Sequence, residues 1–311
     1  MGTRHFTSVI LNGEQKVCQY GQWDEYPTYT GVKLLEFLRD VDMQKFKEAL
    51  NNTRMAVTPY DNASTFTGST KKVSATHNQI WEKQRQINEQ TDNWVGSFLL
   101  AMDMLKAGEL TQQQVDDYIT ATRDTGCDIL QYIYNRDTVL SPLELCAIAD
   151  EFAAVAEFAV RECDGAVPGC GAQGYFVVDL DQGKVFMNFD EVAWQCGFNN
   201  LPQDIDRTMA LFEASSTYMA VPENTDEYLT NIRERLENMG FSIEPTPEEI
   251  ADLVAAGIKR FPNLKPNTHG IDALSGSSKA SLNDQICAAA GRAAGSPLGD
   301  PTVSKEPSPT R

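Results

Sequence analysis

The chain has 311 residues and a formal net charge of −18. Its content of 41% hydrophobic and 23% charged residues is ordinary for a globular protein, so the chain can bury a sizeable core. Nucleic acid is excluded as an expected partner, because phosphate binding depends on clusters of Lys and Arg and the longest basic run is Lys71-Lys72.

The sequence lacks membrane and export signals. No uninterrupted apolar segment reaches the roughly 18 to 20 residues that span a bilayer, and the start MGTRHFTS has no apolar signal segment. The seven cysteines follow no repeating interval, which is typical of a reducing compartment. Cys163 and Cys170 have no CxxC pattern or nearby His that would favour zinc. We therefore expect a soluble, cytoplasmic protein with no membrane association, metal or cofactor.

Residues 4–20 have the pattern of a β-hairpin. The runs RHFTSVIL and EQKVCQY are rich in β-forming residues, and Asn12-Gly13 between them is a preferred pair for a type I′ turn. Apolar residues at helical spacing then predict an amphipathic helix over GVKLLEFLRD, which buries Val32, Leu34, Leu35 and Leu38.

The middle of the chain contains a polar segment and two helix-start patterns. Residues 59–79 are rich in Gly, Ser and Thr and without period, which predicts a long surface loop. Thr111 and Gln114 match a capping box. The motif SPLE at Ser141 predicts an N-cap followed by Pro at the first helical position, with a helix that extends to about Arg161.

The second half contains another hairpin pattern. YFVVDLDQGKVFMNF predicts a hairpin over residues 175–189, which we expect to share a sheet with the first. Helices are predicted to start near Asp204, after Thr225 and at Thr246, where TPEE repeats the Ser/Thr-Pro-x-Glu pattern.

These elements predict an α+β fold. We expect one domain over residues 1–265, in which an antiparallel sheet containing the two hairpins packs with several helices. From Pro266 the chain is rich in Ala, Gly, Ser and Pro and loses its periodicity. Residues 266–311 are therefore predicted to form a disordered tail.

The stretch KVCQYGQWDEYPTYTG, residues 16–31, crowds amide, indole, phenol and carboxylate groups between the hairpin and the helix. Such groups are favoured where contacts must be both apolar and hydrogen-bonded. We predict a recognition loop over residues 19–29 that lines a concavity, with the loop at 59–79 over or beside it. Its predicted ligand-binding residues are Gln19, Gln22, Trp23, Asp24 and Tyr26.

The alternative for this stretch is a packed turn. In that interpretation Trp23, Tyr26 and Pro27 seal one end of the sheet, and Asp24 caps local amides. The favoured hypothesis is a soluble binding or interaction protein with a small-molecule or protein partner that the sequence does not identify.

Three blocks of the sequence resemble an uncharacterised protein family of phage and fungal genomes. The hallmark of that family is a QYGQWDGYP stretch after an N-terminal hairpin, as in RHFTSVILNGEQKVCQYGQWDEYPTYTGVKLLEFL. The resemblance extends to RDTGCDIL at residues 123–130 and to YFVVDLDQGKVF at residues 175–186. Glu25 stands where the family has its second glycine. The resemblance implies an association with phage and brings no known activity.

A competing hypothesis is an amide hydrolase of N-terminal-nucleophile-like architecture, in active or degenerate form. Such amidases begin with a strand that bears Cys, Ser or Thr and carry a later hairpin similar to YFVVDLDQGKVF. The nucleophile would be Cys18, or Thr3 after removal of the two preceding residues. Counting outward from the turn places Cys18 opposite Thr7, with His5 diagonally on the same face. A buried structural cysteine is the alternative.

Two shorter motifs have a structural interpretation. DTGCD at residues 124–128 matches the Asp-Thr-Gly of aspartic proteases, but those enzymes need two such aspartates. We interpret Asp124 or Thr125 as the N-cap of a helix. DLDQG lacks the further ligands of a calcium loop and is predicted to be a turn.

Overall fold

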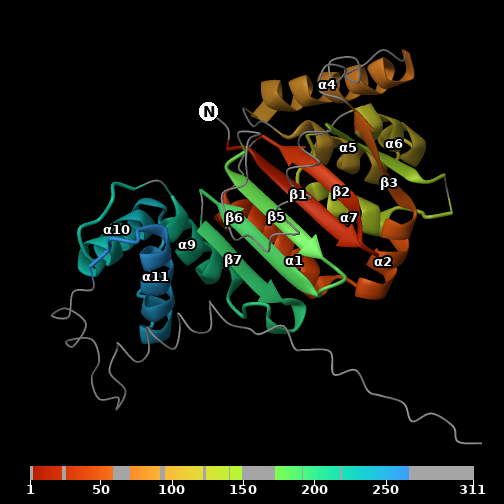
Figure 1. The fold of residues 1–311 in the computed structure, drawn as a ribbon. Helices are drawn as coiled ribbons and strands as arrows, with labels where there is room; N and C mark the ends of the chain where they lie inside the picture. The colour runs from red at the N-terminus through yellow and green to blue at the C-terminus, as the bar shows by residue number, and fades with distance from the viewer. Residues whose placement is uncertain are drawn as a thin grey trace, which may run out of the picture. The chain divides into compact units, whose positions relative to one another are not determined.

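The protein has an α+β fold (Figure 1). Its contacts group the chain into two compact units, Met1–Tyr218 and Met219–Arg311, which are described separately below. The predicted boundary at residue 265 and the predicted disordered tail stay predictions, because the tail lies outside the described residues. The computed structural model describes residues 3–22, 26–58, 71–91, 95–121, 124–139, 141–148, 172–190, 192–217 and 219–265.

The first unit is built on a five-stranded sheet with the order β2-β1-β5-β6-β7. β1 and β5 run parallel, and the other neighbours are antiparallel. Both predicted hairpins, β1–β2 and β5–β6, therefore share one sheet, which confirms the prediction. The strands are β1 (His5–Leu11), β2 (Glu14–Gly21), β5 (Gly174–Asp179), β6 (Lys184–Phe189) and β7 (Val192–Gly197).

The turn of the first hairpin is hydrogen-bonded to the second hairpin. Asn12 and Gly13 have φ of 57° and 69°, the left-handed values that a type I′ turn needs. The carboxylate of Asp181, in the turn of the second hairpin, accepts both backbone N–H groups, at 2.8 Å from Asn12 and 2.7 Å from Gly13. This carboxylate therefore holds the two hairpin turns together at one end of the sheet.

The register of the first hairpin differs from the prediction by one residue. A β-bulge midway along β1–β2 places Cys18 opposite Ser8 instead of Thr7. Such a shift turns the following side chains to the other face of the sheet. Cys18 consequently packs in a cluster with Phe6, on the face opposite to the one that His5 uses.

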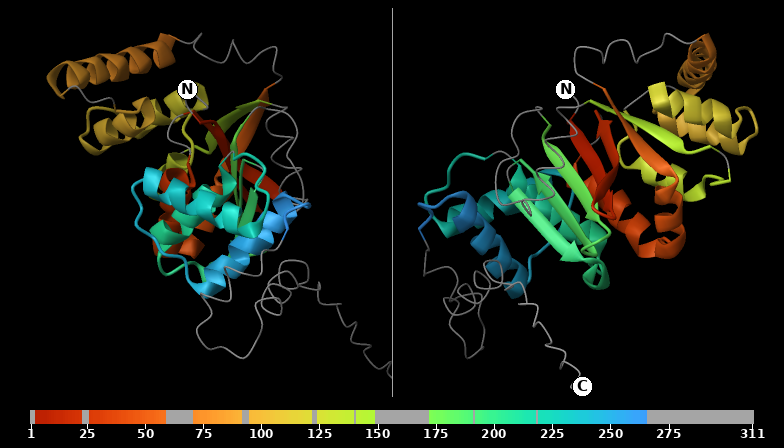
Figure 2. Two further views of the ribbon diagram at one scale, coloured as in Figure 1. Left: turned by 90° about the vertical axis from the view of Figure 1, so that its left-hand side faces the viewer. Right: turned by 45° about the vertical axis from the view of Figure 1, so that its right-hand side comes forward.

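Helices cover one face of this sheet, and further helices pack beside it. The main core contains side chains of α1, α2, α7 and α9 together with inward residues of the strands. Helix α4 packs on α5 and α6 (Figure 2). In the described residues of this unit the α-helices are α1 (Val32–Asp40), α2 (Met43–Asn51), α4 (Lys71–Thr91), α5 (Ser97–Lys106), α6 (Gln112–Ala121), α7 (Asp128–Asn135) and α9 (Ile205–Ser216).

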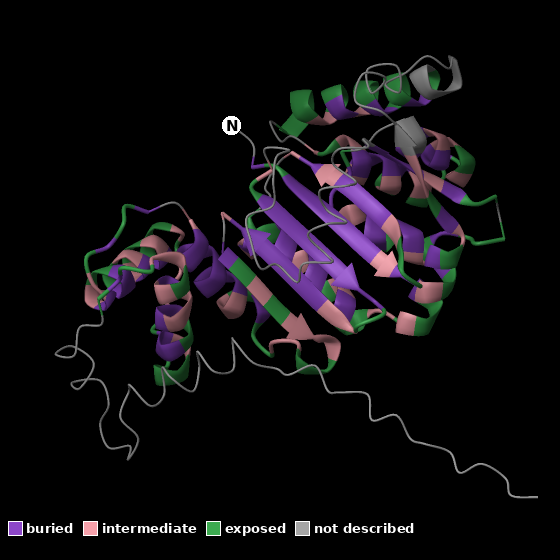
Figure 3. Cartoon of the chain, in the orientation of Figure 1, coloured by how far each residue is buried: buried purple, intermediate pink, exposed green. Residues whose placement is uncertain are grey.

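Short helical segments of other types lie beside the α-helices. A π-helix, η1 (Pro27–Gly31), leads into α1, and a 3-10 helix, η3 (Phe198–Asn200), follows β7. The central strands are more buried than the edge strand. β5 and β6 are buried almost throughout, whereas exposed and less exposed residues alternate along β7 (Figure 3). None of the helices in the described part of the chain has the length and apolarity needed to cross a membrane.

The helix predicted from Ser141 is wrong over its first part. Strand β4 (Leu143–Ile148) occupies that position and pairs in parallel with β3 (Thr53–Thr58), beside β2. Leu143, Leu145, Cys146 and Ala147 are buried and Glu144 is less buried, so side chains on both faces of this strand are covered. Tertiary pairing has overridden the local helix-start signal. The rest of the predicted helix lies outside the described residues.

Two other boundaries are corrected. The predicted surface loop at 59–79 is helical from Lys71, where α4 begins, and its earlier part lies outside the described residues. Helix α7 begins at Asp128 with Cys127 at its N-cap, so the predicted cap at Asp124 or Thr125 is wrong.

Two predicted capping boxes are confirmed. At the start of α6 the backbone N–H of Thr111 donates to the Gln114 side chain, and the Gln114 N–H donates back to the Thr111 hydroxyl. At the start of α11 Thr246 and Glu249 make the same reciprocal pair. In both cases the local sequence is enough to define where the helix starts.

The second unit contains the helices α10 (Thr225–Asn238) and α11 (Pro247–Arg260). They pack through the buried side chains Tyr228, Ile232, Leu236, Ile250 and Val254. Gly257 of α11 faces Tyr228 so closely that a Cβ atom added to it would lie 2.6 Å from Cε1 of the tyrosine ring. The glycine therefore permits the close approach of the two helices.

Replacing Gly257 by alanine is expected to lower the free energy of unfolding of this unit by about 1–3 kcal/mol. The clash outweighs the gain of about 1 kcal/mol in helix propensity that alanine brings. Chemical denaturation of the full chain, followed by a probe in the second unit, measures the change. In a Tyr228→Leu background the same substitution should cost less, and an equal cost in both backgrounds would contradict the role given to the ring.

Candidate functional site

Two motifs that are far apart in the sequence meet at the end of β2. The Thr125 hydroxyl donates to Oε1 of Gln19 at 2.7 Å, and the N–H of Gly126 donates to the carbonyl of Tyr20 at 2.9 Å. Nε2 of Gln19 donates to the carbonyl of Cys146 on β4 at 3.1 Å. The QYG and DTGCD segments thus form one packed junction, and Gln19 connects three segments of the chain.

A glycine and a histidine complete this junction. Gly126 has φ of +52°, and a Cβ atom there would lie 3.0 Å from Cε1 of His5. The imidazole of His5 also meets the ring of Phe176 edge to face, with ring centres 5.4 Å apart. Burial lowers the pKa of His5 from 6.5 to about 3, so this histidine is neutral at physiological pH.

The residues predicted to bind a ligand have different environments. Gln19 is fully buried, and its amide group bonds within the protein, which gives it a structural role. Gln22 accepts a hydrogen bond from the Tyr20 hydroxyl at 2.7 Å. Tyr26 remains 42% exposed, and its ring meets Phe189. The other two predicted ligand residues, Trp23 and Asp24, lie outside the described part of the chain, so their role stays a prediction.

The turn after this loop is anchored to α9. Oε2 of Glu213 accepts hydrogen bonds from the N–H of Thr28 at 3.0 Å and from its hydroxyl at 2.5 Å. Burial raises the pKa of Glu213, although the two bonds from Thr28 oppose the shift. The anchor fixes η1, and with it the start of α1.

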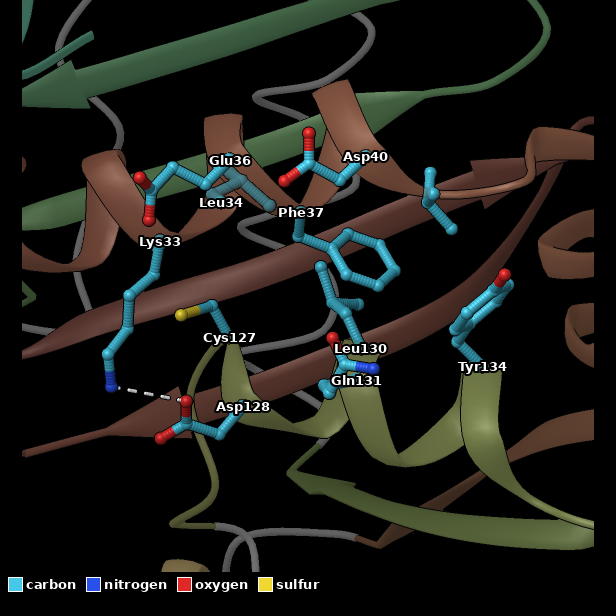
Figure 4. A pocket seen from close by; sticks show the side chains of 11 residues that line it. Lys33, Leu34, Glu36, Phe37, Asp40, Cys127, Asp128, Leu130, Gln131 and Tyr134 are labelled. Atoms are coloured by element: carbon cyan, nitrogen blue, oxygen red, sulfur yellow. Dashed lines mark hydrogen bonds and ion pairs between the residues drawn. The ribbon is translucent and has the colours of Figure 1, made fainter.

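An open groove of about 490 Å³ lies between α1 and α7 (Figure 4). Helix α1 packs mainly on η1 and α9, whereas α7 packs mainly on α2, which leaves space between α1 and α7. The groove begins where the two motifs meet, because α1 follows the QYGQWDEYP segment and α7 follows DTGC. Its lining residues are Lys33, Leu34, Glu36, Phe37, Asp40, Val41, Cys127, Asp128, Leu130, Gln131 and Tyr134.

An ion pair closes one end of the groove. Nζ of Lys33 lies 3.2 Å from Oδ1 of Asp128 and 4.1 Å from the centre of the Tyr29 ring. Burial lowers the pKa of Lys33, but hydrogen bonding to Tyr29 and the charge of Asp128 outweigh it, so the pKa is raised overall. Burial, and then the charge of Asp128, raise the pKa of the Cys127 thiol to about 12. Lys33 is therefore charged and Cys127 is protonated at neutral pH.

Carboxylates line the α1 side of the groove. We call Glu36 and Asp40, one helical turn apart, the acidic rim. Arg39 contacts both, with Nε 3.0 Å from Oδ1 of Asp40 and Nη2 3.8 Å from Oε1 of Glu36. Hydrogen bonding to Arg39 lowers the pKa of Asp40. At the other end Lys45 lies over the Tyr134 ring, 4.2 Å from its centre.

Sequence reasoning did not identify this groove. It placed Val32, Leu34, Leu35 and Leu38 on the buried face of an amphipathic helix and made no prediction for the other side of α1. The available signal was Phe37, an aromatic residue outside that stripe. Its ring packs edge to face on Phe46, with ring centres 5.0 Å apart, and remains partly exposed toward the groove.

Cys18 and His5 lie on opposite faces of the sheet, so the same-face placement inferred from the hairpin register is wrong. Cys18 is 2% exposed, which agrees with the alternative of a buried structural cysteine. Thr3, the other predicted nucleophile, is only 4% exposed. Within the described ranges no group of three or more His, Cys, Asp or Glu side chains could hold a metal ion. Comparison of the chain with protein-family models, curated proteins and solved structures found no match.

Proposed function

We propose that this protein is a binding protein that holds a helical segment of a protein partner in the groove between α1 and α7. The observation that carries the proposal is the apolar floor of this groove, formed by the partly exposed side chains of Phe37, Val41 and Tyr134 above the fully buried Leu34 and Leu130. Binding sites commonly combine such a floor with a few polar groups at the edges.

The dimensions of the groove suit a helix. The lining residues of α1 and its C-cap extend from Lys33 to Val41, which corresponds to about 12 Å along the helix axis. An amphipathic helix that binds in a groove uses anchors at positions i, i+3 or i+4, and i+7, which extend over a similar length. A partner segment of about two turns therefore matches the floor.

The chemistry of the groove supports binding more than covalent catalysis. The Cys127 thiol is a poor nucleophile while it stays protonated, and the Lys33 ammonium is held in its charged form. The exposed Tyr29, at the end of the predicted recognition loop, lies beside Lys33. The recognition loop predicted over residues 19–29 would then extend the same binding surface.

Filling the groove is expected to abolish partner binding. Gln131 is exposed on α7 and lines the groove, so Gln131→Trp places an indole over the apolar floor. We expect peptides selected on the full-length protein from a yeast-displayed library of amphipathic helices to bind this variant at least about tenfold more weakly. Fluorescence anisotropy with the selected, labelled peptides measures the affinity.

The matched control places the same ring elsewhere. Gln113 is exposed on α6 and does not line the groove, so Gln113→Trp should leave the affinity unchanged. Circular dichroism of both variants checks that they fold. Selected peptides that bind both variants equally well, or a library that yields no binder, would contradict the proposed function.

A further inference from the structure

We propose that the partner segment is a basic amphipathic helix, whose arginine or lysine side chains bind the acidic rim of Glu36 and Asp40. This inference rests on the proposed function and adds the chemistry of the partner. It follows from the charges around the groove, from the position of Arg39 and from the charge of the chain.

The acidic rim is available to a partner. The side chains of Glu36 and Asp40 are 49% and 69% exposed, and they lie beside the apolar floor on the α1 side (Figure 4). The third carboxylate of the groove, Asp128, is already paired with Lys33. A cationic side chain from a helix on the floor would therefore meet Glu36 and Asp40 first.

Arg39 shows which group fits the rim. Its guanidinium contacts both carboxylates, its side chain is 47% exposed, and it is not among the residues that line the groove. Exposed ion pairs of this kind contribute little to stability, so a partner arginine can replace Arg39 at small cost. The replacement keeps the number of ion pairs and returns Arg39 to solvent. Arg39 is thus an internal competitor for the partner's cation.

The charge of the whole chain acts in the same direction. A net charge of −18 attracts a basic segment at long range and repels an acidic one. Such complementarity favours the encounter rate and the choice of partner more than the final affinity. Local and global charge therefore select the same class of partner.

The experiment compares two synthetic helical peptides with identical apolar positions, one with arginine and one with glutamine at the positions facing α1. At low ionic strength the arginine peptide should bind the full-length protein about tenfold more tightly. The double variant Glu36→Gln/Asp40→Asn should remove this difference. The control Glu237→Gln/Asp252→Asn removes the same charge from exposed positions of the second unit and should preserve it.

Removing the internal competitor should strengthen binding. In the Arg39→Gln variant we expect the arginine peptide to bind several-fold more tightly and the glutamine peptide to bind as before. If the acidic protein attracted the peptide only through its net charge, removing any one positive charge would have the same effect. Lys259→Gln removes one positive charge from α11 and is the matched control. Equal effects of the two substitutions would contradict the proposal.

The outcomes separate this inference from the proposed function. If both peptides bind equally well and both lose affinity in Gln131→Trp, the groove binds a helix but the basic specificity is wrong. If neither peptide loses affinity in Gln131→Trp, the proposed function itself is wrong. If the arginine preference survives in Glu36→Gln/Asp40→Asn, the rim does not recognise the cation.

Discussion

Replacing Asp116 by alanine is expected to lower the free energy of unfolding of the first unit by about 3–5 kcal/mol. The side chains of Asp116 and Arg136 are only 8% and 3% exposed, and Nη2 of the arginine lies 2.7 Å from Oδ2 of the aspartate. The Tyr132 hydroxyl donates to Oδ1 of Asp116 at 2.7 Å. The substitution leaves a buried guanidinium without its counter-charge and removes the acceptor of a buried phenol.

The control for this prediction is an exposed ion pair. Arg54 and Glu144 lie 2.6 Å apart with side chains 68% and 38% exposed, so Glu144→Gln should cost no more than about 1 kcal/mol. Replacing Asp116 by leucine and Arg136 by methionine together should recover much of the loss, because no buried charge then remains. Urea denaturation followed by circular dichroism measures all three variants. A loss below about 1 kcal/mol for Asp116→Ala would contradict the assigned role.

The elements that the sequence predicts correctly are those with local causes. Asn12-Gly13 specifies a turn through its preference for positive φ, and Thr246 with Glu249 specifies a helix start through two reciprocal hydrogen bonds. These interactions join residues no more than three positions apart, so a short sequence window contains the full physical reason. The prediction that the two hairpins share one sheet came from the fold class and is confirmed, whereas the direct parallel pairing of β1 with β5 was not predicted.

The features that sequence reasoning missed depend on distant partners. Leu143 and Leu145 belong to a strand because β3 pairs with it, although the preceding Ser-Pro pair favours a helix. The bulge in the first hairpin has no turn-like signature, yet it moves Cys18 to the other face. The groove exists because α1 and α7 pack on different neighbours. None of these causes can be seen in a window around the residue concerned.

The candidate site shows the same division. The sequence predicted that residues 16–31 carry recognition groups, and the structure connects this segment to the groove through η1 and α1. The sequence could not show that the side-chain amide of Gln19 forms hydrogen bonds with Thr125 and Cys146, which come from remote parts of the chain. The role of Phe37 also needed the position of α7.

Acidification is expected to destabilise the first unit through His5. The folded-state pKa of His5 is about 3, whereas the ordinary value is 6.5. Between these two pH values the imidazole is protonated in the unfolded chain and neutral in the folded chain. The contribution of His5 to stability is complete above pH 6.5 and is lost as the pH falls toward 3. Over the whole window the loss reaches about 4–5 kcal/mol.

A non-titrating variant isolates this contribution. His5→Gln keeps a polar side chain of similar size, and its free energy of unfolding should change less between pH 6.5 and 3 than that of the wild type. The same substitution at an exposed position of α4, His77→Gln, is the matched control for the loss of an imidazole. The remaining carboxylates titrate in all three proteins, so the difference between the curves reports His5.

Glu213 acts in the opposite direction and has to be separated from His5. Its folded-state pKa is raised above the ordinary value of 4.5, so its contribution is present below that value and is lost as the pH rises. Glu213→Gln should therefore remove a contribution to stability that is present at low pH. The total loss of stability on acidification then becomes larger, although the contribution of His5 is unchanged. Parallel stability curves for the wild type and His5→Gln would show that the imidazole gains access to water in the folded state.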